Sequence, residues 1–196
     1  MKRSFLSLLF VVCTMLLVFG QEHSVNLNKS NIAWAANKKI TKGHNGDVKI
    51  QSGNLIVKNN VLHGGSFVID MHSMTCEDIK DAEYNAKLIG HLKNDDFFSV
   101  EKHPTATIKI KKVFIVKGKE NTYSALADLT IKGITNEIKF PVTLKKNNND
   151  KFIAESKFNI DRSKWDIRYG SDSFFDNLGD KAIKNEIEFA VLIETL

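Results

Sequence analysis

The chain has few of the residues that cross-link or interrupt a fold. Its 196 residues include two cysteines, Cys13 and Cys76, and two prolines, Pro104 and Pro141. Cys13 lies in an N-terminal apolar run, so Cys76 is left without a partner and no disulfide framework is predicted. Stability must therefore come from a hydrophobic core, which a chain of this length can bury. The scarcity of proline and the lack of a low-complexity linker indicate one domain.

Catalytic and metal-binding motifs are also missing from the sequence. The six histidines show no His-x-His or i, i+4 spacing, so we expect no metal site. Cys76 has no identifiable histidine partner, and no Gly-x-Ser-x-Gly stretch marks a serine nucleophile. We expect no cofactor and no enzymatic activity. The small net charge of +5, without a basic patch among aromatic residues, argues against nucleic-acid binding.

One long hydrophobic run is present, at the N-terminus. Lys2 and Arg3 precede a mostly apolar stretch from residue 5 to residue 19, and a polar stretch follows. This pattern predicts a secretory signal peptide over residues 1–20, cut before Gln21, and therefore an exported protein of residues 21–196. Its removal lowers the net charge from +5 to +3. The alternative is an uncleaved anchor, because a spanning helix needs roughly 18 apolar residues.

Most of the remaining chain alternates apolar and polar side chains, with the period of two that is typical of half-buried strands. The segments are 28–40, 46–73, 104–118, 121–134, 136–146, 151–163 and 183–196. The second contains a predicted turn at Asn59-Asn60, so about eight strands are expected. Short connections rich in Gly, Asn and Lys favour antiparallel neighbours.

One stretch departs from this alternation. Residues 76–92 carry apolar side chains at helical spacing and acidic residues early, so they predict an α-helix with Thr75 as its N-cap. The helix is inserted between the third and fourth strands. Several strands are apolar on both faces, which fits either an up-and-down antiparallel β-barrel closed by its first and last strands or a two-sheet sandwich.

Four stretches, read in order, carry a resemblance to a known family. They are "SNIAWAANKKITKGHNGDVKIQSGNL" (30–55), "HLKNDDFFSVEKHPTATIKI" (91–110), "LADLTIKGITNEIKFPVTL" (126–144) and "FNIDRSKWDI" (158–167). In this order they closely resemble the YceI-like family over residues 24–195. The resemblance implies a lipocalin-like barrel, periplasmic or secreted in bacteria, whose interior binds a polyisoprenoid or similar apolar small molecule. Two features depart from the family pattern, Trp165-Asp166 and the pair Phe174-Phe175, and both bear on the length of the pocket and the identity of the ligand.

On this basis we predict a set of ligand-binding residues, most of them aromatic or aliphatic. They are Trp34, His44, Phe67, Ile69, Phe97, Phe98, Phe114, Leu129, Ile131, Phe158, Arg162, Trp165 and Phe174. Phe97 and Phe98 either enter the lumen or anchor the helix to the barrel. His44 contacts a ligand head group or is a turn histidine. Arg162 binds a diphosphate or makes a structural salt link with Asp161.

The function expected from this reading is binding of a long apolar lipid, polyisoprenoid or isoprenoid quinone in type, as carrier, store or sensor. Two alternatives stay open: a binder of another amphiphile such as a fatty acid or amide, and a stress-related structural protein whose barrel is filled by its own side chains. Lipid exchange implies transient contact with a membrane. The sequence leaves the oligomeric state open, and the role of Cys76 is either a buried small side chain or a free thiol.

Overall fold

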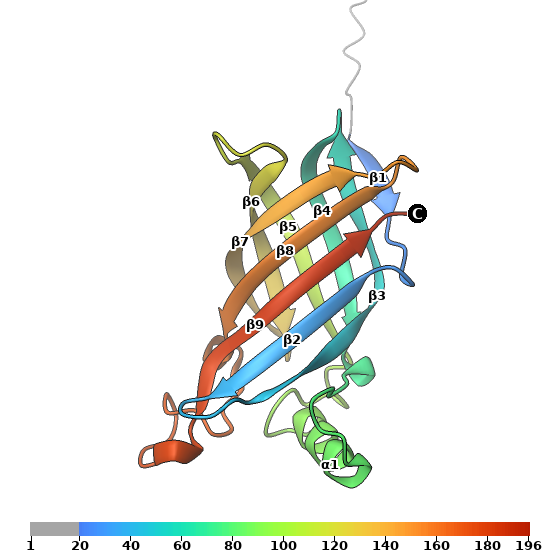
Figure 1. Cartoon of the computed structure of the whole chain (residues 1–196). Coiled ribbons are helices and arrows are strands. Elements are labelled where there is room, and N and C mark those ends of the chain that lie inside the picture. The colour runs from blue at the N-terminus through green and yellow to red at the C-terminus, as the bar shows by residue number, and fades with distance from the viewer. Residues whose placement is uncertain (1–19) are drawn as a thin grey trace, which may run out of the picture.

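Nine antiparallel strands build the protein in a computed structural model that describes residues 20–196 (Figure 1). The predicted signal peptide lies outside the described residues, apart from Gly20. The strands are β1 (Gln21–Ser24), β2 (Asn31–Lys38), β3 (His44–Lys58), β4 (Val61–Asp70), β5 (Thr105–Ile115), β6 (Thr122–Ile131), β7 (Ile134–Lys146), β8 (Phe152–Asp161) and β9 (Ile183–Glu194). Among residues 20–196, no helix has the length and apolar character needed to cross a bilayer.

Eight of these strands close into a barrel. The hydrogen-bonded order is β3-β2-β9-β8-β7-β6-β5-β4, and β4 pairs back onto β3. The short β1 and the longer β2 both pair with the same edge of β3. Strand β2 pairs with the first half of β3, and β1 pairs with its second half. The predicted up-and-down barrel, closed by its last and first long strands, is therefore confirmed, and the sandwich alternative is wrong.

Two tight turns join consecutive strands of the barrel. Asn59 and Asn60 both have positive φ, 51° and 63°, between β3 and β4. This is the conformation that two-residue hairpin turns need and that asparagine tolerates. Lys132 and Gly133, with φ of 51° and 72°, form the equivalent turn between β6 and β7. The predicted Asn59-Asn60 turn is confirmed.

The helix follows β4, the third long strand, as predicted, but it begins later than residue 76. Helix α1 spans Ala82–Lys93, and its N-cap is Asp81, whose carboxylate accepts a backbone N–H of the first turn at 2.9 Å. Thr75 is not the N-cap. Its N–H donates to the carbonyl of Asp47 on β3 at 2.9 Å, so the chain before α1 is held extended beside the sheet. This tertiary pairing overrides the helical pattern of residues 76–81.

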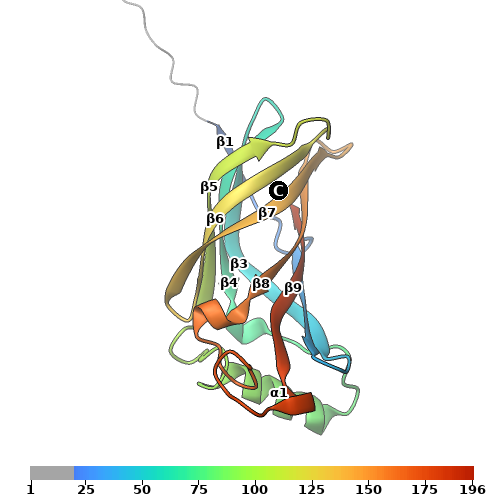
Figure 2. The same ribbon diagram turned by 90° about the vertical axis from the view of Figure 1, so that its left-hand side faces the viewer.

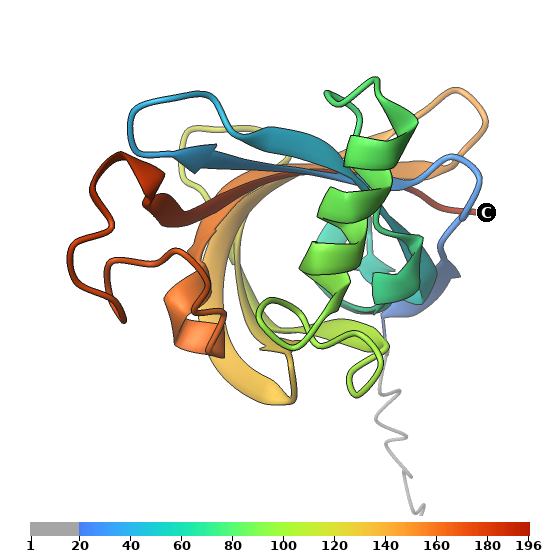
Figure 3. The ribbon, with the colours of Figure 1, turned by 90° about the horizontal axis from the view of Figure 1, so that it is seen from below.

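The two ends of the barrel differ, and we call the one that carries α1 the helical end. There α1 lies across the barrel, accompanied by three short 3₁₀ helices, η1 (Met71–Ser73), η2 (Arg162–Trp165) and η3 (Gly179–Lys181) (Figure 3). At the opposite end, side chains of the strands themselves fill the interior, among them Tyr123, Leu144 and Phe152. The barrel is therefore plugged at one end and covered at the other.

Candidate ligand-binding site

An apolar cavity runs along the inside of the barrel. Its volume is about 170 Å³. The cavity begins at Leu55 and Leu62, in the half of the barrel away from α1, and reaches Leu92 of α1 and Phe97 at the helical end. Strands β2 to β9 all contribute side chains. The lining is apolar except for Glu155, Ser156 and Arg162. A water molecule in such a space has few hydrogen-bonding partners, whereas an apolar chain gains from leaving water.

Nine of the predicted ligand-binding residues lie on this cavity. They are Trp34, Phe67, Ile69, Phe97, Phe98, Leu129, Ile131, Phe158 and Arg162. Phe97 also packs edge-on against His91 of α1, with ring centroids 4.9 Å apart, and against Tyr169 at 5.1 Å. Phe97 therefore lines the lumen and anchors the covering helix at once. Contact of these nine with a ligand stays a prediction.

Phe114 does not reach the lumen, and a β-bulge is the reason. Ile110 on β5 lines the cavity, but the register with β6 shifts between Ile110 and Lys112. One extra residue reverses which side chains face inward. Beyond the shift Val113 packs against the core, and Phe114 pairs with Ser124 and is 50% exposed. The strict alternation assumed from the sequence placed Phe114 on the wrong face.

The other three predicted residues also lie outside the cavity lining. Trp165 is almost fully buried in the core of the helical end, where its indole N–H donates to the carbonyl of Leu129 at 3.1 Å. Phe174 is 38% exposed, and the guanidinium of Arg168 lies 5.1 Å from its ring centre. His44, the first residue of β3, contacts a carboxylate near the rim of the helical end, described below.

The indole N–H of Trp34 is a buried hydrogen-bond donor on the wall of the lumen. Its nitrogen has no hydrogen-bond partner, which sets it apart from every other buried side-chain nitrogen or oxygen in residues 20–196. A buried donor without an acceptor costs about 1–3 kcal/mol. Trp34 lines the cavity beside Ala36 and packs with the core of the helical end. An acceptor atom on a bound molecule would satisfy it.

Arg162 is the charged residue that faces the helical end of the lumen. Its guanidinium donates to the carbonyls of Ile167 at 2.8 Å, Ile183 at 3.2 Å and Lys184 at 3.2 Å. These bonds fasten η2 to the start of β9 and use three of the five guanidinium N–H groups. Burial lowers the pKa of Arg162, with partial compensation from nearby Asp161 and Asp172. The bonds are to backbone carbonyls, so the predicted salt link does not describe how Arg162 is held.

The barrel wall is incompletely paired between β7 and β8. Their ladder has four residue pairs, 143–146 against 152–155. Toward the helical end the two strands run apart, and in the described chain 134–142 and 156–161 do not pair with each other (Figure 2). Pro141 has no N–H to donate, and the hydroxyl of Ser156 donates to its carbonyl at 2.5 Å. Because Glu155 and Ser156 also border the cavity, the lumen reaches the wall at this seam.

Some lining residues were missing from the predicted set. Phe140 on β7 and Phe189 on β9 flank Phe158, with ring centroids 4.9 and 5.6 Å from it. The signal that would have found Phe189 is its parity with Ile187 and Val191 on one face of the last strand. The barrel and its lumen define this molecule as a lipocalin-like β-barrel protein.

The comparisons agree with that class. The chain matches the family model described as YceI-like domain over residues 23–195, and it belongs to the YceI-like family. No relative was found among curated proteins.

Solved structures share the fold at low sequence identity. BcnA of Burkholderia cenocepacia is 20% identical, with a TM-score of 0.69 over 88% of this chain and 99% of that one. A polyisoprenoid binding domain from Saccharophagus degradans, implicated in plant cell wall breakdown, is 14% identical with a TM-score of 0.65 over 89% and 98%. The Campylobacter jejuni YCEI protein is 18% identical, with a TM-score of 0.54 over 74% and 81%.

Proposed function

We propose that this protein binds a long isoprenoid lipid in the lumen of its barrel, as a carrier, store or sensor. The observation that carries the proposal is the apolar cavity that follows the barrel axis. Burial gains about 0.8 kcal/mol per CH₂ before the costs of binding are deducted. Even a net gain of about 0.3 kcal/mol per heavy atom gives tight binding for a prenyl chain of many carbons.

Two hydrogen-bond donors at the helical end of the lumen orient this ligand. The unpartnered indole N–H of Trp34 and the remaining N–H groups of Arg162 both belong to the helical end. We infer a ligand whose oxygen-bearing head accepts a hydrogen bond from Trp34, and whose apolar tail extends toward Leu55 and Leu62. A quinone carbonyl, a phenol or an amide supplies such an acceptor, whereas a pure hydrocarbon does not.

The family supports binding rather than catalysis as the role of the barrel. The Saccharophagus degradans structure of the same fold is described as a polyisoprenoid binding domain. A fatty acid or fatty amide is the second candidate ligand, because its carbonyl suits Trp34 equally well. The cavity itself favours either ligand over a barrel filled by its own side chains. Export to the bacterial periplasm or beyond, with transient membrane contact during lipid exchange, is part of the proposal.

Mass spectrometry of solvent extracts tests it directly. The protein is purified from its own cell envelope, and we expect one lipid per protein, with the five-carbon mass spacing of an isoprenoid. A stoichiometric fatty acid or amide would replace the isoprenoid with the second candidate. An extract without lipid, from protein shown to be folded and never exposed to detergent, would overturn both.

A further inference from the structure

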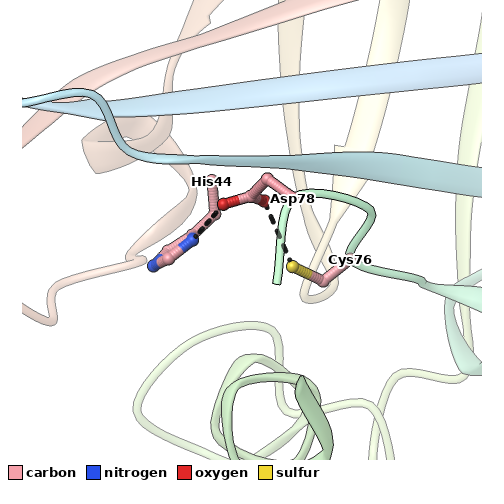
Figure 4. Close-up of side chains that lie close together, drawn as sticks. All are labelled: His44, Cys76 and Asp78. Atoms are coloured by element: carbon pink, nitrogen blue, oxygen red, sulfur yellow. Dashed lines mark hydrogen bonds and ion pairs between the residues drawn. The ribbon is translucent and has the colours of Figure 1, made fainter. Parts of the chain in front are cut away.

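A cluster of three different ligand types lies at the rim of the helical end. His44 begins β3, whereas Cys76 and Asp78 belong to the extended segment that precedes α1. His44 Nδ1 is 2.9 Å from one carboxylate oxygen of Asp78, and Cys76 Sγ is 3.3 Å from the other (Figure 4). The nitrogen, sulfur and carboxylate donors all lie within 4.8 Å of one another. None of the three lines the cavity, so the cluster is separate from the lipid site.

The backbone holds the two segments of the cluster together. The N–H of Glu77 donates to the carbonyl of Asn45 at 2.8 Å, and the N–H of Asn45 donates to the Asp78 carboxylate at 3.0 Å. Gly46 is packed so closely that a Cβ on it would lie 1.9 Å from the carbonyl oxygen of Thr75. The absence of a side chain on Gly46 therefore lets the cysteine-bearing segment lie directly on β3.

A side chain of α1 completes this support from the other direction. The amide of Asn85 donates to the carbonyls of Cys76 and Ile79, at 2.8 and 3.0 Å. The donor atoms thus sit on backbone that is fixed from both flanks before any ligand arrives. Preorganisation of this kind is what a metal site requires of its surroundings.

The geometry points to a binding site for Zn²⁺ or a similar late first-row cation, held by His44 Nδ1, Cys76 Sγ and an Asp78 carboxylate oxygen. Imidazole, thiolate and carboxylate are the three common zinc ligands, with bond lengths of about 2.0–2.3 Å. Tetrahedral bonds of that length put donor atoms roughly 3.3–3.7 Å apart. The contacts of His44 and Cys76 with the two oxygens of Asp78, at 2.9 and 3.3 Å, are near that range, and all the donor atoms lie within 4.8 Å of one another. Three protein ligands leave a fourth position for water or another group.

Metal binding changes the protonation of the cluster. In the metal-free protein the Cys76 thiol donates to the Asp78 carboxylate at 3.3 Å. The metal must displace this thiol proton into solvent, forming a metal–thiolate bond and releasing Asp78 from the thiol. Deprotonation of this kind is the general rule for cysteine ligands.

Cobalt substitution tests the site with a direct readout. Tag-free protein is stripped with a chelator and titrated with Co²⁺, and we expect one equivalent to produce a thiolate-to-cobalt charge-transfer band and the strong visible bands of tetrahedral coordination. Zn²⁺ should bleach them by displacement. Cys76→Ser should abolish the charge-transfer band. His44→Gln and Asp78→Asn should each weaken Zn²⁺ binding more than about 100-fold, since even outer ligand partners are worth 10–100-fold.

A matched control uses another histidine of the barrel. His63 is exposed near the start of β4, next to the Asn59-Asn60 turn and at the end of the barrel opposite the cluster, so His63→Ala should bind Co²⁺ as the unaltered protein does. The site is overturned if Co²⁺ gives no charge-transfer band, or if His63→Ala weakens it as much as His44→Gln does. Circular dichroism on every variant confirms folding. Cys76→Ser is the conservative change that keeps the test valid if His44→Gln misfolds. Lipid extraction is scored separately, so loss of one site does not imply loss of the other.

Discussion

Phe140 of β7 stacks on Phe158 of β8, with ring centroids 4.9 Å apart and planes 26° from parallel, where the backbone ladder between the two strands has already ended. Side-chain packing therefore keeps β7 and β8 in contact where their backbone hydrogen bonds have ended. Ser156 adds a second bridge through its hydroxyl, which donates to the carbonyl of Pro141. The seam is thus held by side chains alone on the way to the helical end.

Hydrogen exchange should reveal this seam. Backbone amides of residues 156–160 that point toward β7 lack a partner strand, so we expect them to exchange much faster than those of the same residues that pair with β9. NMR-detected exchange on backbone amides measures this alternation. Uniform protection along β8 would show that the two strands pair fully in solution.

Trp34→Phe should distinguish the contribution of the ligand's head to binding affinity from that of its tail. The change removes the indole N–H and keeps an aromatic ring on the cavity wall. Loss of one hydrogen bond of about 1 kcal/mol weakens binding of an oxygen-bearing lipid roughly fivefold. Affinity for a hydrocarbon of the same length should not fall, and the empty variant should be no less stable. Equal losses for both ligands would place the head elsewhere.

Ala154→Phe should block the lumen without unfolding the barrel. Ala154 is buried and lines the cavity, so a phenyl ring there occupies ligand space. Overpacking of a filled core costs about 1–3 kcal/mol, and existing free volume lowers that cost. Ala33→Phe, one residue before Trp34 and on the other face of β2, is the matched control. We expect co-purified lipid to vanish in the first variant only, by mass spectrometry. Lipid retained in Ala154→Phe at wild-type levels would contradict lumen binding.

Arg162→Met should destabilise the helical end. The substitution leaves the carbonyls of Ile167, Ile183 and Lys184 without their donor. We expect the free energy of unfolding to fall by about 2–4 kcal/mol. Urea denaturation measures the change, and Arg168→Met, at an exposed arginine, serves as the control. A loss below about 0.5 kcal/mol would show that these bonds do not secure the fold.

The Asp78 carboxylate should make stability depend on acid pH. Its pKa is about 2 in the folded protein against an ordinary value of 3.8, so the unfolded state takes up the proton first. The stabilisation is complete above about pH 4 and is lost as pH falls toward 2. In chelator, Asp78→Asn should therefore cost about 1–2 kcal/mol at pH 7 and much less near pH 2. Asp150→Asn, on an exposed turn, is the control. Denaturation curves at both pH values decide, and an equal cost at both would show that the charge plays no part.

Much of the architecture followed from local patterns. Period-two alternation located the long strands, and the Asn59-Asn60 pair fixed one hairpin, because asparagine accepts positive φ at low cost. The helix was found but its start was not, since the pairing of Thr75 with Asp47 competes with the helical pattern and involves residues 28 positions apart. Phe114 was placed inside because a bulge on β5 leaves no mark in the alternation itself.

The sequence by itself determined the strand class, the inserted helix and an apolar interior, because these depend on side-chain periodicity and on turns of a few residues. Only the tertiary structure decided that the sheet closes, that Trp34 faces the lumen without a partner, and that β7 and β8 part. It also brought His44 to Cys76 and Asp78, across more than thirty positions, through the pairing of two extended segments. Contacts of that kind depend on register and on the space above a glycine, which no local pattern encodes.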